Sequence, residues 1–307
     1  MFLYYLLGSI VLTSYLTLSF KVCEKLSIPI FPAIVCNYIT CVITGSVVNG
    51  AFPINAKVAG LSWFPWAMAM GVLFVSIFNV IGLTAQKNGI AVASVAAKLS
   101  LVIPVVLSVF LYQESLSFAK QMGIGIALLA VVLTCWPSRP PKVQKTDNPV
   151  KHVPEPKGNN DRAIWVLPVV LFLGSGLLDA LINHVQQTMV KPAENNAYLI
   201  SGFFSAAVIG TTVLVYQMVF QQKKLSAKAV IAGIAIGIPN YFSIWCLVRF
   251  LQQSPWPSAA SIPVNNMGIV LFSTLVAAIV FKEKLQAINL LGIALATVAI
   301  ALVAGWF

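Results

Sequence analysis

Residues 112–127, YQESLSFAKQMGIGIA, have a counterpart further along the chain in residues 281–296, FKEKLQAINLLGIALA. Glu114 and Glu283 are 169 residues apart, and so are Gly123 and Gly292. A fixed offset of this size over a 307-residue chain indicates two copies of one structural unit. In both copies the acidic residue precedes an apolar run.

The composition is that of an integral membrane protein. Hydrophobic residues make up 59% of the chain and charged residues 9%, with a mean hydropathy of +0.90, whereas soluble domains are about a quarter charged. Runs near the ~20 residues that a membrane-spanning helix needs occur at ten places. These are residues 2–20, 30–48, 64–85, 90–112, 116–136, 164–182, 197–220, 229–251, 256–281 and 286–307.

The ten runs divide into two sets of five, so we expect an all-α membrane protein built from two five-helix repeats. Because five is odd, the second repeat enters the bilayer from the opposite side, as in transporters with inverted repeats. The predicted units are a first repeat at 1–136, a charged, proline-rich linker at 137–163 and a second repeat at 164–307.

Net charge, cysteines and motifs argue against other classes of protein. The formal charge of +11 comes mostly from loop residues, which fits membrane orientation better than nucleic-acid binding. The five cysteines form no CxxC pair, and the chain lacks HExxH, GxSxG and GxxxxGK[ST]. We therefore expect no enzyme activity, no metal and no cofactor.

Ionisable residues inside spans are the sharpest functional signal, since each costs about 2.5–3.5 kcal/mol at the centre of a helix. Lys98 lies well inside the fourth run and Asp179 well inside the sixth. Lys98 could bind an anionic group of a substrate, switch with a coupling proton, or pair with Asp179 as a structural bridge. The sequence leaves open whether the two side chains meet.

Uncharged polar residues follow the same spans. Asp179, Asn183 and Gln186 lie along one face of the sixth helix, and the third and eighth helices carry similar stripes. The position of Lys98 falls near Asn265, Asn266 and Met267 in the second repeat, and Trp245 either packs in the core or walls a cavity. From these stripes we predict a polar central cavity, with amides acting as helix-to-helix contacts as the alternative. The predicted binding residues are Lys98, Asn79, Asp179, Asn183, Asn240, Ser243, Trp245, Asn265 and Asn266.

Two further patterns predict local structure. Glu114 and Glu283 each precede the next apolar run, so we expect each carboxylate to stabilise the N-terminus of the helix that follows it. Prolines stand inside the fourth, sixth, eighth and ninth runs, at Pro104, Pro168, Pro239 and Pro263. They indicate either ordinary membrane-helix prolines or broken helices beside a pathway.

The chain resembles the drug/metabolite transporter superfamily, in particular its EamA-like ten-helix branch. The resemblance is carried by Ala91 to Ser94 leading into Pro104, by Glu114 with the run from Gly123, and by their second copies. It covers almost the whole chain outside 137–163. It implies a bundle of two inverted five-helix repeats around a central cavity. Ser273, which stands where the first repeat has Pro104, departs from that pattern, as does Lys98.

We therefore expect a secondary transporter that moves a small polar or amphipathic metabolite by alternating access, with protons as a coupling ion. An anionic or zwitterionic substrate fits Lys98, and the phosphate carriers of the same fold make it attractive by analogy. Two alternatives stay open: a flippase for a lipid-linked polar headgroup, and a receptor or assembly subunit without flux. The expected location is the bacterial inner (plasma) membrane, crossed many times.

Orientation gives a first testable prediction. Loop charges favour one side by fourteen to three, and by eight to three without the linker, so the positive-inside rule places the linker side in the cytoplasm and both termini outside. EamA-like carriers generally keep both termini inside. Fused after Phe307, a reporter that works only outside the cytoplasm is expected to be active, and one that works only inside to be silent. The reverse result would show that the placement is inverted. The fourteen residues are Lys21, Lys25, Lys87, Arg139, Lys142, Lys145, Lys151, Lys157, Arg162, Lys223, Lys224, Lys228, Lys282 and Lys284, against Lys57, Lys120 and Lys191.

Overall fold

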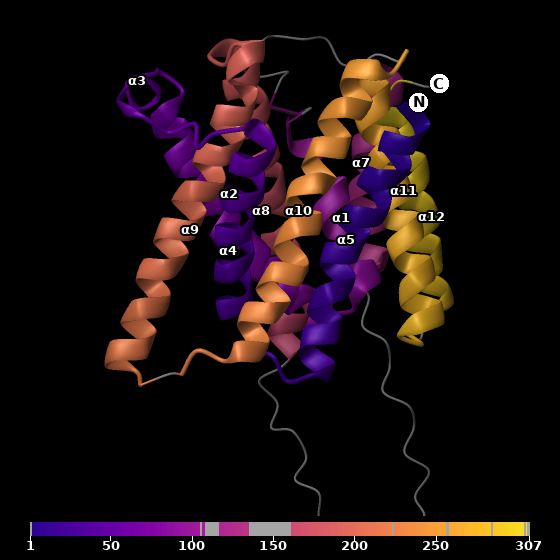
Figure 1. The fold of residues 1–307 in the computed structure, drawn as a ribbon. Coiled ribbons are helices and arrows are strands. Elements are labelled where there is room, and N and C mark those ends of the chain that lie inside the picture. Colours follow the sequence, from indigo (N-terminus) through magenta and orange to yellow (C-terminus); the bar gives the residue numbers. More distant parts are fainter. Residues whose placement is uncertain are drawn as a thin grey trace, which may run out of the picture.

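The computed structural model describes residues 2–104, 106–107, 117–134, 161–222, 224–255, 258–283, 285–303 and 305. Every regular element among them is a helix (Figure 1). The helices are α1 (Phe2–Lys25), α2 (Ile30–Asn49), α3 (Ala56–Ala59), α4 (Phe64–Lys87), α5 (Ile90–Leu99), α7 (Phe118–Thr134), α8 (Asp161–Thr188), the 3-10 helix η1 (Pro192–Glu194), α9 (Asn195–Phe220), α10 (Ala227–Gln253), α11 (Ser258–Val280) and α12 (Ala287–Val303).

Within the described ranges, seven helices are long and apolar enough to cross a bilayer: α1, α2, α4, α8, α9, α10 and α11. Three further apolar helices, α5, α7 and α12, are shorter, and the seventeen residues of α7 correspond to about 25 Å of rise. Glu114 and almost all of the predicted linker lie outside the described residues. The exception is the end of the linker, because α8 begins at Asp161.

The helices run up and down the molecule, with both ends of the chain at the same end (Figure 1). We call the opposite end, where α7 ends at Thr134 and α8 begins, the linker end. There the Asn289 side chain at the start of α12 donates hydrogen bonds to the carbonyls of Leu133 and Thr134, at 3.3 and 3.0 Å. Glu283 therefore also belongs to the linker end.

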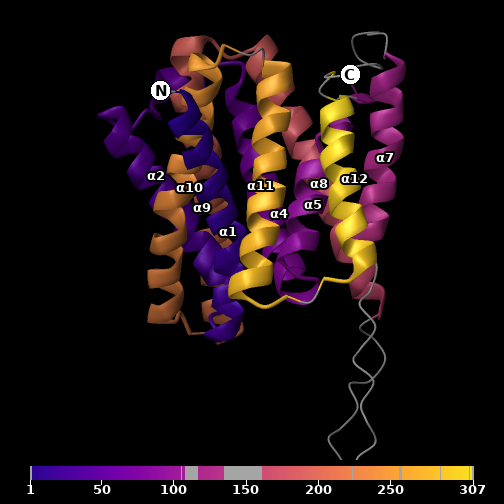
Figure 2. The same ribbon diagram turned by 90° about the vertical axis from the view of Figure 1, so that its right-hand side faces the viewer.

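The α7 and α12 helices pack side by side and antiparallel (Figure 2). Gly123 near the start of α7 lies against Val303 at the end of α12, and Gly292 near the start of α12 lies against Thr134 at the end of α7. Both pairs are related by the same 169-residue offset. Small residues at these crossings let the two backbones approach closely, as is usual between membrane helices.

The same relation holds for other helix pairs. When α1, α2, α4, α5 and α7 are replaced by α8, α9, α10, α11 and α12, and the reverse, one observed contact becomes another observed contact, and we call this replacement the exchange. Thus α2 packs on α10 and α9 on α4; α1 packs on α10 and α8 on α4; α1 packs on α11 and α8 on α5. Glycines occupy two equivalent crossings: Gly71 of α4 meets Ser205 of α9, and Gly237 of α10 meets Thr40 of α2.

The exchange fails at four contacts. α1 packs on α4 and on α5, α2 packs on α4, and α5 packs on α12, but in the part of the chain that the structure describes the matching pairs α8–α10, α8–α11, α9–α10 and α11–α7 make no comparable contact. The contact of α1 with α4 includes the linker end, where Lys21 Nζ donates to the carbonyl of Gln86 at 3.0 Å. The first half therefore has contacts between its own helices that have no comparable equivalent in the second half over the described residues.

The four prolines inside the apolar runs affect their helices in two different ways. Pro168, Pro239 and Pro263 lie inside helices that continue past them. In the fourth run the helix α5 ends at Leu99, five residues before Pro104. Residues 100 and 101 form a turn, and helix resumes at 102–104. Pro104 has no N–H to donate to Ser100, and its ring crowds that carbonyl, so the break falls where proline chemistry places it. The Ser100 carbonyl instead accepts from Ile103 N at 2.8 Å.

The α7–α12 contact gives a prediction about stability. A Cβ added at Gly292 would lie 2.5 Å from the backbone nitrogen of Thr134 and 3.0 Å from the Ala130 carbonyl oxygen, whereas at Gly125 nothing lies within 4 Å. Gly292→Ala is expected to lower the stability in detergent by about 1–3 kcal/mol through overpacking, measured as a drop in unfolding temperature. The matched Gly125→Ala variant is expected to match the wild type; an equal loss in both variants would contradict the close approach.

Candidate functional site

The break in α5 brings the two predicted intramembrane charges into one region. Ser100, the residue at the break, donates from Oγ to the Ala97 carbonyl at 2.6 Å and to Asp179 Oδ2 at 3.3 Å. Asp179 comes from α8, which packs against α5. Lys98 lies two residues before Ser100, close enough for its charge to interact with that of Asp179.

Lys98 and Asp179 do not form a tight ion pair. Among the described residues the salt bridge within 4.0 Å joins Lys21 to Glu24 at the linker end. Both Lys98 and Asp179 are largely but not wholly buried. Lys98 is eight residues, or about 12 Å, from the start of α5, which is near the middle of a ~30 Å hydrocarbon core. A neighbouring opposite charge offsets part of the cost of burying each group.

Two helices near this region carry buried polar atoms without a partner in the described structure. They are Ser94 Oγ on α5 and Asn265 Oδ1 on α11, and these helices pack against each other. The exposed fractions of the two residues are 3% and 2%. A buried group that makes no hydrogen bond costs stability, so each has an unused capacity to bind. Asn266, the second predicted amide on α11, is buried as well.

A second polar cluster joins α10 to α2. Asn240 Nδ2 donates to Asn37 Oδ1 at 3.1 Å, and Ser243 Oγ donates to the Asn240 carbonyl at 2.8 Å. Cys41 Sγ lies 3.4 Å from the carbonyl of Gly237. Asn240 and Ser243, both predicted site residues, therefore belong to a buried helix contact, which fits the interhelical role of amides in membranes.

The remaining predicted residues lie elsewhere. Asn79 Nδ2 donates to the carbonyl of Val75 in its own helix at 2.7 Å, and Asn183 is exposed on α8. Trp245 packs edge-on against Tyr5, with ring centroids 5.6 Å apart, and its ring lies under Arg249. Trp245 is therefore at least partly a packing residue.

Sequence reasoning missed Ser100 and Asn37. Asn37 is an amide inside the second run, so the criterion that selected Asn240 would also have selected it. Ser100 was hidden because a serine bonded within its own helix looks the same in the sequence as one that reaches another helix.

The predicted role of Glu283 is wrong in one respect. Its carboxylate accepts from the backbone nitrogen of Ile90, the first residue of α5, at 3.0 and 3.1 Å. It therefore stabilises a helix N-terminus, as expected, but that of a helix in the other half of the chain and not that of α12, which follows it.

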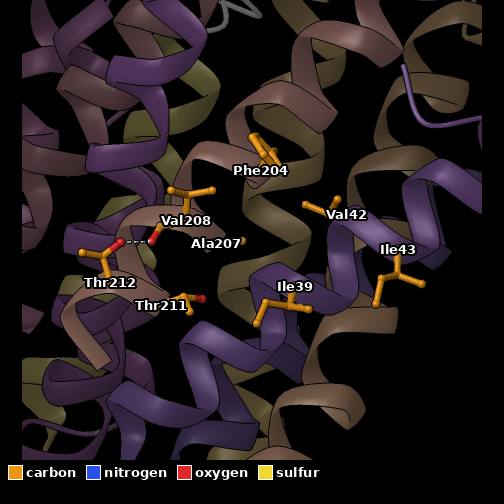
Figure 3. A pocket seen from close by; sticks show the side chains of 8 residues that line it. All are labelled: Ile39, Val42, Ile43, Phe204, Ala207, Val208, Thr211 and Thr212. Atoms are coloured by element: carbon orange, nitrogen blue, oxygen red, sulfur yellow. Dashed lines mark hydrogen bonds between the residues drawn. The ribbon is translucent and has the colours of Figure 1, made fainter. Parts of the chain in front are cut away.

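Two apolar cavities lie among the described residues, and neither is the predicted polar cavity. The first, of about 380 Å³, lies between α2 and α9 and is lined by Ile39, Val42, Ile43, Phe204, Ala207, Val208, Thr211 and Thr212 (Figure 3). The second, of about 220 Å³, is lined by Val102, Ile103, Val106, Leu107, Ile124, Leu128 and Phe172. Neither contains a predicted binding residue. No group of three His, Cys, Asp or Glu side chains within the described ranges is placed to hold a metal ion.

Comparisons with known proteins support the fold. No family model matches the chain. An uncharacterised protein of Haemophilus influenzae is 25% identical over 283 residues, which cover 89% of this chain and 88% of that protein. A protein of known crystal structure superposes with a TM-score of 0.57 at 15% identity, covering 97% of this chain and 95% of the other. The arrangement of helices therefore recurs in a solved structure.

The nearness of Lys98 to Asp179 gives a prediction about the coupling between their charges. Lys98→Met and Asp179→Asn are each expected to destabilise the protein in detergent by on the order of 1–3 kcal/mol, because each leaves one charge without its counterpart. The double variant is expected to be more stable than either single variant, as a double-mutant cycle on unfolding temperature would show. Strictly additive losses would mean that the two charges do not interact.

Proposed function

We propose that the protein is a secondary transporter of a small polar metabolite, built as two inverted five-helix repeats that alternate access to a site at the break in α5. The observation that carries the proposal is the interruption of α5 at Ser100 and Leu101, beside Lys98 and Asp179. Broken backbone at membrane depth is tolerated where it is buried in protein or lines a cavity. In transporters such breaks form the binding site near the midplane.

The contacts of the helices support an inverted repeat. Exchanging each helix of the first half with its counterpart in the second reproduces most of the helix pairs. The counterparts α7 and α12 pack antiparallel, so the axis that relates them is perpendicular to both helices and, for helices that cross a bilayer, lies in the membrane plane. We accordingly count α5, α7 and α12 as spans, for a total of ten, with the residues outside the described ranges completing them.

The failure of that exchange within the halves, at the contacts of α1 with α4 and α5 and of α2 with α4, supports alternating access. Two inverted halves with identical contacts would be equally open to both sides of the membrane. Here α1 closes on α4 and α5, whereas α8 does not close comparably on α10 and α11 in the described parts of these helices. Such an arrangement is that of one of two states, which interconvert when the halves exchange their contacts.

The site favours a substrate with an anionic or zwitterionic group. Lys98 supplies a cation and Asp179 an anion, while Ser94 Oγ and Asn265 Oδ1 have unused hydrogen-bonding capacity. Lys98 and Asp179 are ionisable groups at this depth. A proton that moves with the substrate would therefore bind to one of these two side chains. From the resemblance in sequence, and not from these site residues, we also propose membership of the drug/metabolite transporter superfamily and a place in the bacterial inner membrane.

One observation favours a second function. The cavity between α2 and α9 is lined by apolar side chains and includes the exposed Ile43. An apolar groove that faces the bilayer would suit the chain of a lipid whose headgroup enters the polar site, as in a flippase.

Purified protein in proteoliposomes decides between these functions. Radiolabelled amino acids, organic anions, sugar phosphates and a fluorescent lipid-linked headgroup are offered in turn, with a pH gradient of either direction. We expect flux of a water-soluble anion or zwitterion. Flux of the lipid alone would favour the flippase, and binding without any flux would favour a receptor.

Substitution of Lys98 gives the matching prediction on activity. Lys98→Met keeps length and apolarity but deletes the charge, and we expect transport of the substrate found in the panel to fall at least about tenfold, the effect of one lost charge-assisted contact. The control is Lys57→Met, in the short helix α3, where the lysine is exposed. Normal affinity and normal pH dependence in Lys98→Met would show that the site is elsewhere.

A further inference from the structure

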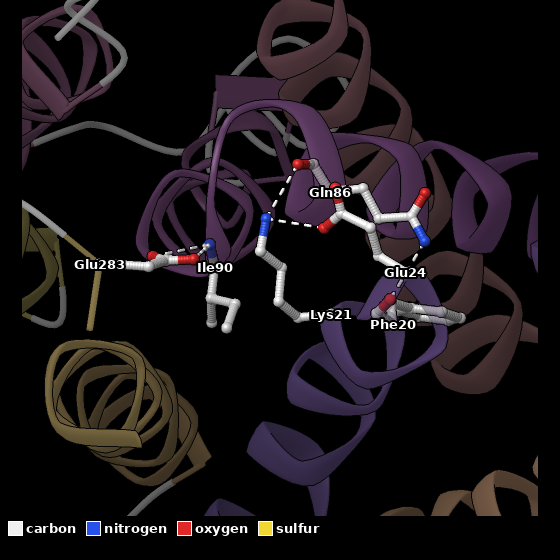
Figure 4. A network of polar contacts seen from close by, with 6 residues as sticks. All are labelled: Phe20, Lys21, Glu24, Gln86, Ile90 and Glu283. Carbon is white, nitrogen blue, oxygen red and sulfur yellow. Dashed lines mark hydrogen bonds and ion pairs between the residues drawn. The ribbon is translucent and has the colours of Figure 1, made fainter. Parts of the chain in front are cut away.

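The linker end of the molecule is held together by a polar network (Figure 4). Lys21 of α1 pairs with Glu24 at 2.8 Å and donates to the Gln86 carbonyl of α4 at 3.0 Å. Gln86 Nε2 in turn donates to the Phe20 carbonyl at 3.1 Å. The Lys21–Glu24 pair lies within α1, and the other two contacts join α1 to α4, so the three contacts stay within the first half.

The Glu283 contact is different because it joins the two halves. Both carboxylate oxygens lie within 3.1 Å of the Ile90 backbone nitrogen, across 193 residues of sequence. The first N–H groups of a helix have no partner within it and carry the positive end of its dipole, so a carboxylate there is held by a charge-assisted hydrogen bond. Nearby, Lys25 lies over the ring of Phe281, 4.7 Å from its centroid, and so adds a second link from α1 to the segment after α11.

Gly89 shows how closely the two halves approach. Its φ is +100°, a conformation that favours glycine, and a Cβ at this position would lie 3.1 Å from Glu283 Oε2. A larger residue would therefore disturb both the turn into α5 and the carboxylate. The turn at Gly89 and the carboxylate of Glu283 fit as one unit.

The contact stands between the proposed site and the linker end. Ile90 begins the same helix that carries Lys98 eight residues, or about 12 Å, further in. It also lies at the end where α1 packs on α4 through Lys21 and Gln86. α1 packs on α5 as well, whereas α8 makes no comparable contact with α10 or α11 in the described structure. To open a path from the linker end to Lys98, the segment after α11 must separate from the start of α5.

We propose that the Glu283 carboxylate is a latch between the two halves, which keeps the linker end closed while it is bound to the N-terminus of α5 and lets that end open when the bond breaks. The latch rests on the proposed function, because it assigns a gate to a transporter. It also specifies which end is closed in this structure and which contact must break before the other state forms.

Labelling of the native Cys23 tests the latch. Cys23 lies in the last turns of α1 next to the network and is 3% exposed, so it reacts slowly with a bulky, charged maleimide while the linker end is closed. In nanodiscs, Glu283→Gln and more strongly Glu283→Ala are expected to raise the labelling rate of Cys23 by about tenfold or more, the effect of losing a hydrogen bond to a charged group. Labelled peptides are identified by mass spectrometry.

Three controls make the result specific. Glu24→Gln neutralises a carboxylate of the same network within the first half, and we expect Cys23 to label there as in the wild type. Cys41, fully buried at the crossing of α2 with α10, is expected to stay protected in every variant. Gly89→Ala leaves Glu283 in place but pushes on its carboxylate, and should raise Cys23 labelling on its own, even if the Glu283 variants fail to fold.

Unchanged Cys23 labelling in the folded Glu283 variants and in Gly89→Ala would overturn the latch. An equal rise at Cys23 and Cys41 would overturn it too, because Glu283 would then support the whole fold and not one end. The labelling needs no substrate, so it fails or succeeds separately from the flux assay. If Cys23 labelling does not respond to the variants while flux depends on Lys98, the latch is wrong and the transporter proposal stands. If Cys23 labelling responds while no flux is found, the latch stands as a contact that holds this end and the transporter proposal is wrong.

Discussion

A backbone N–H or C=O group that lacks a partner in the hydrocarbon of a bilayer costs several kcal/mol. In this protein that constraint accounts for the regular elements, all of which are helices over the described residues, and for the glycines at their crossings. Among the described helices α5 is interrupted, because Pro104 has no N–H to donate to the Ser100 carbonyl. That carbonyl accepts a hydrogen bond from Ile103 N instead, and the Ser100 hydroxyl donates to Asp179 of α8. A break that is costly in lipid is thus satisfied by protein.

The break also connects the fold with the proposed chemistry. A continuous helix would present Lys98 as an isolated cation at a depth where it costs about 2.5–3.5 kcal/mol. The turn instead directs Ser100 to Asp179, whose charge offsets that of Lys98. In the second half α11 is continuous and has Asn265 and Asn266 next to Met267, the residue equivalent to Lys98. In the proposed repeat the two halves therefore contribute different polar groups to the region between them.

In the transport cycle that we propose, contacts across the two halves select which end of the molecule is closed. The α7–α12 packing is reciprocal, with Gly123 and Gly292 in equivalent places, and it has no preference for either end. The polar network, in contrast, lies at the linker end alone, because Glu283 binds the N-terminus of α5 there. A packing interface that fits both states, together with a short polar contact that selects one of them, agrees with the two-state carrier that we propose.

The sequence by itself determined the membrane class and the positions of the long helices, because hydrophobic length is a property of residues along the chain. It also indicated a repeat through the fixed offset, but it left open which of Pro104, Pro168, Pro239 and Pro263 would break a helix, and only Pro104 does so. It also placed Lys98 and Asp179 at depth. Only the tertiary structure decided that these two charges come near each other while Asn240 binds Asn37, that the described cavities are apolar, and that Glu283 caps α5 and not α12. Those outcomes depend on which helix faces which, and a contact between residues 193 positions apart leaves no local signal in the sequence.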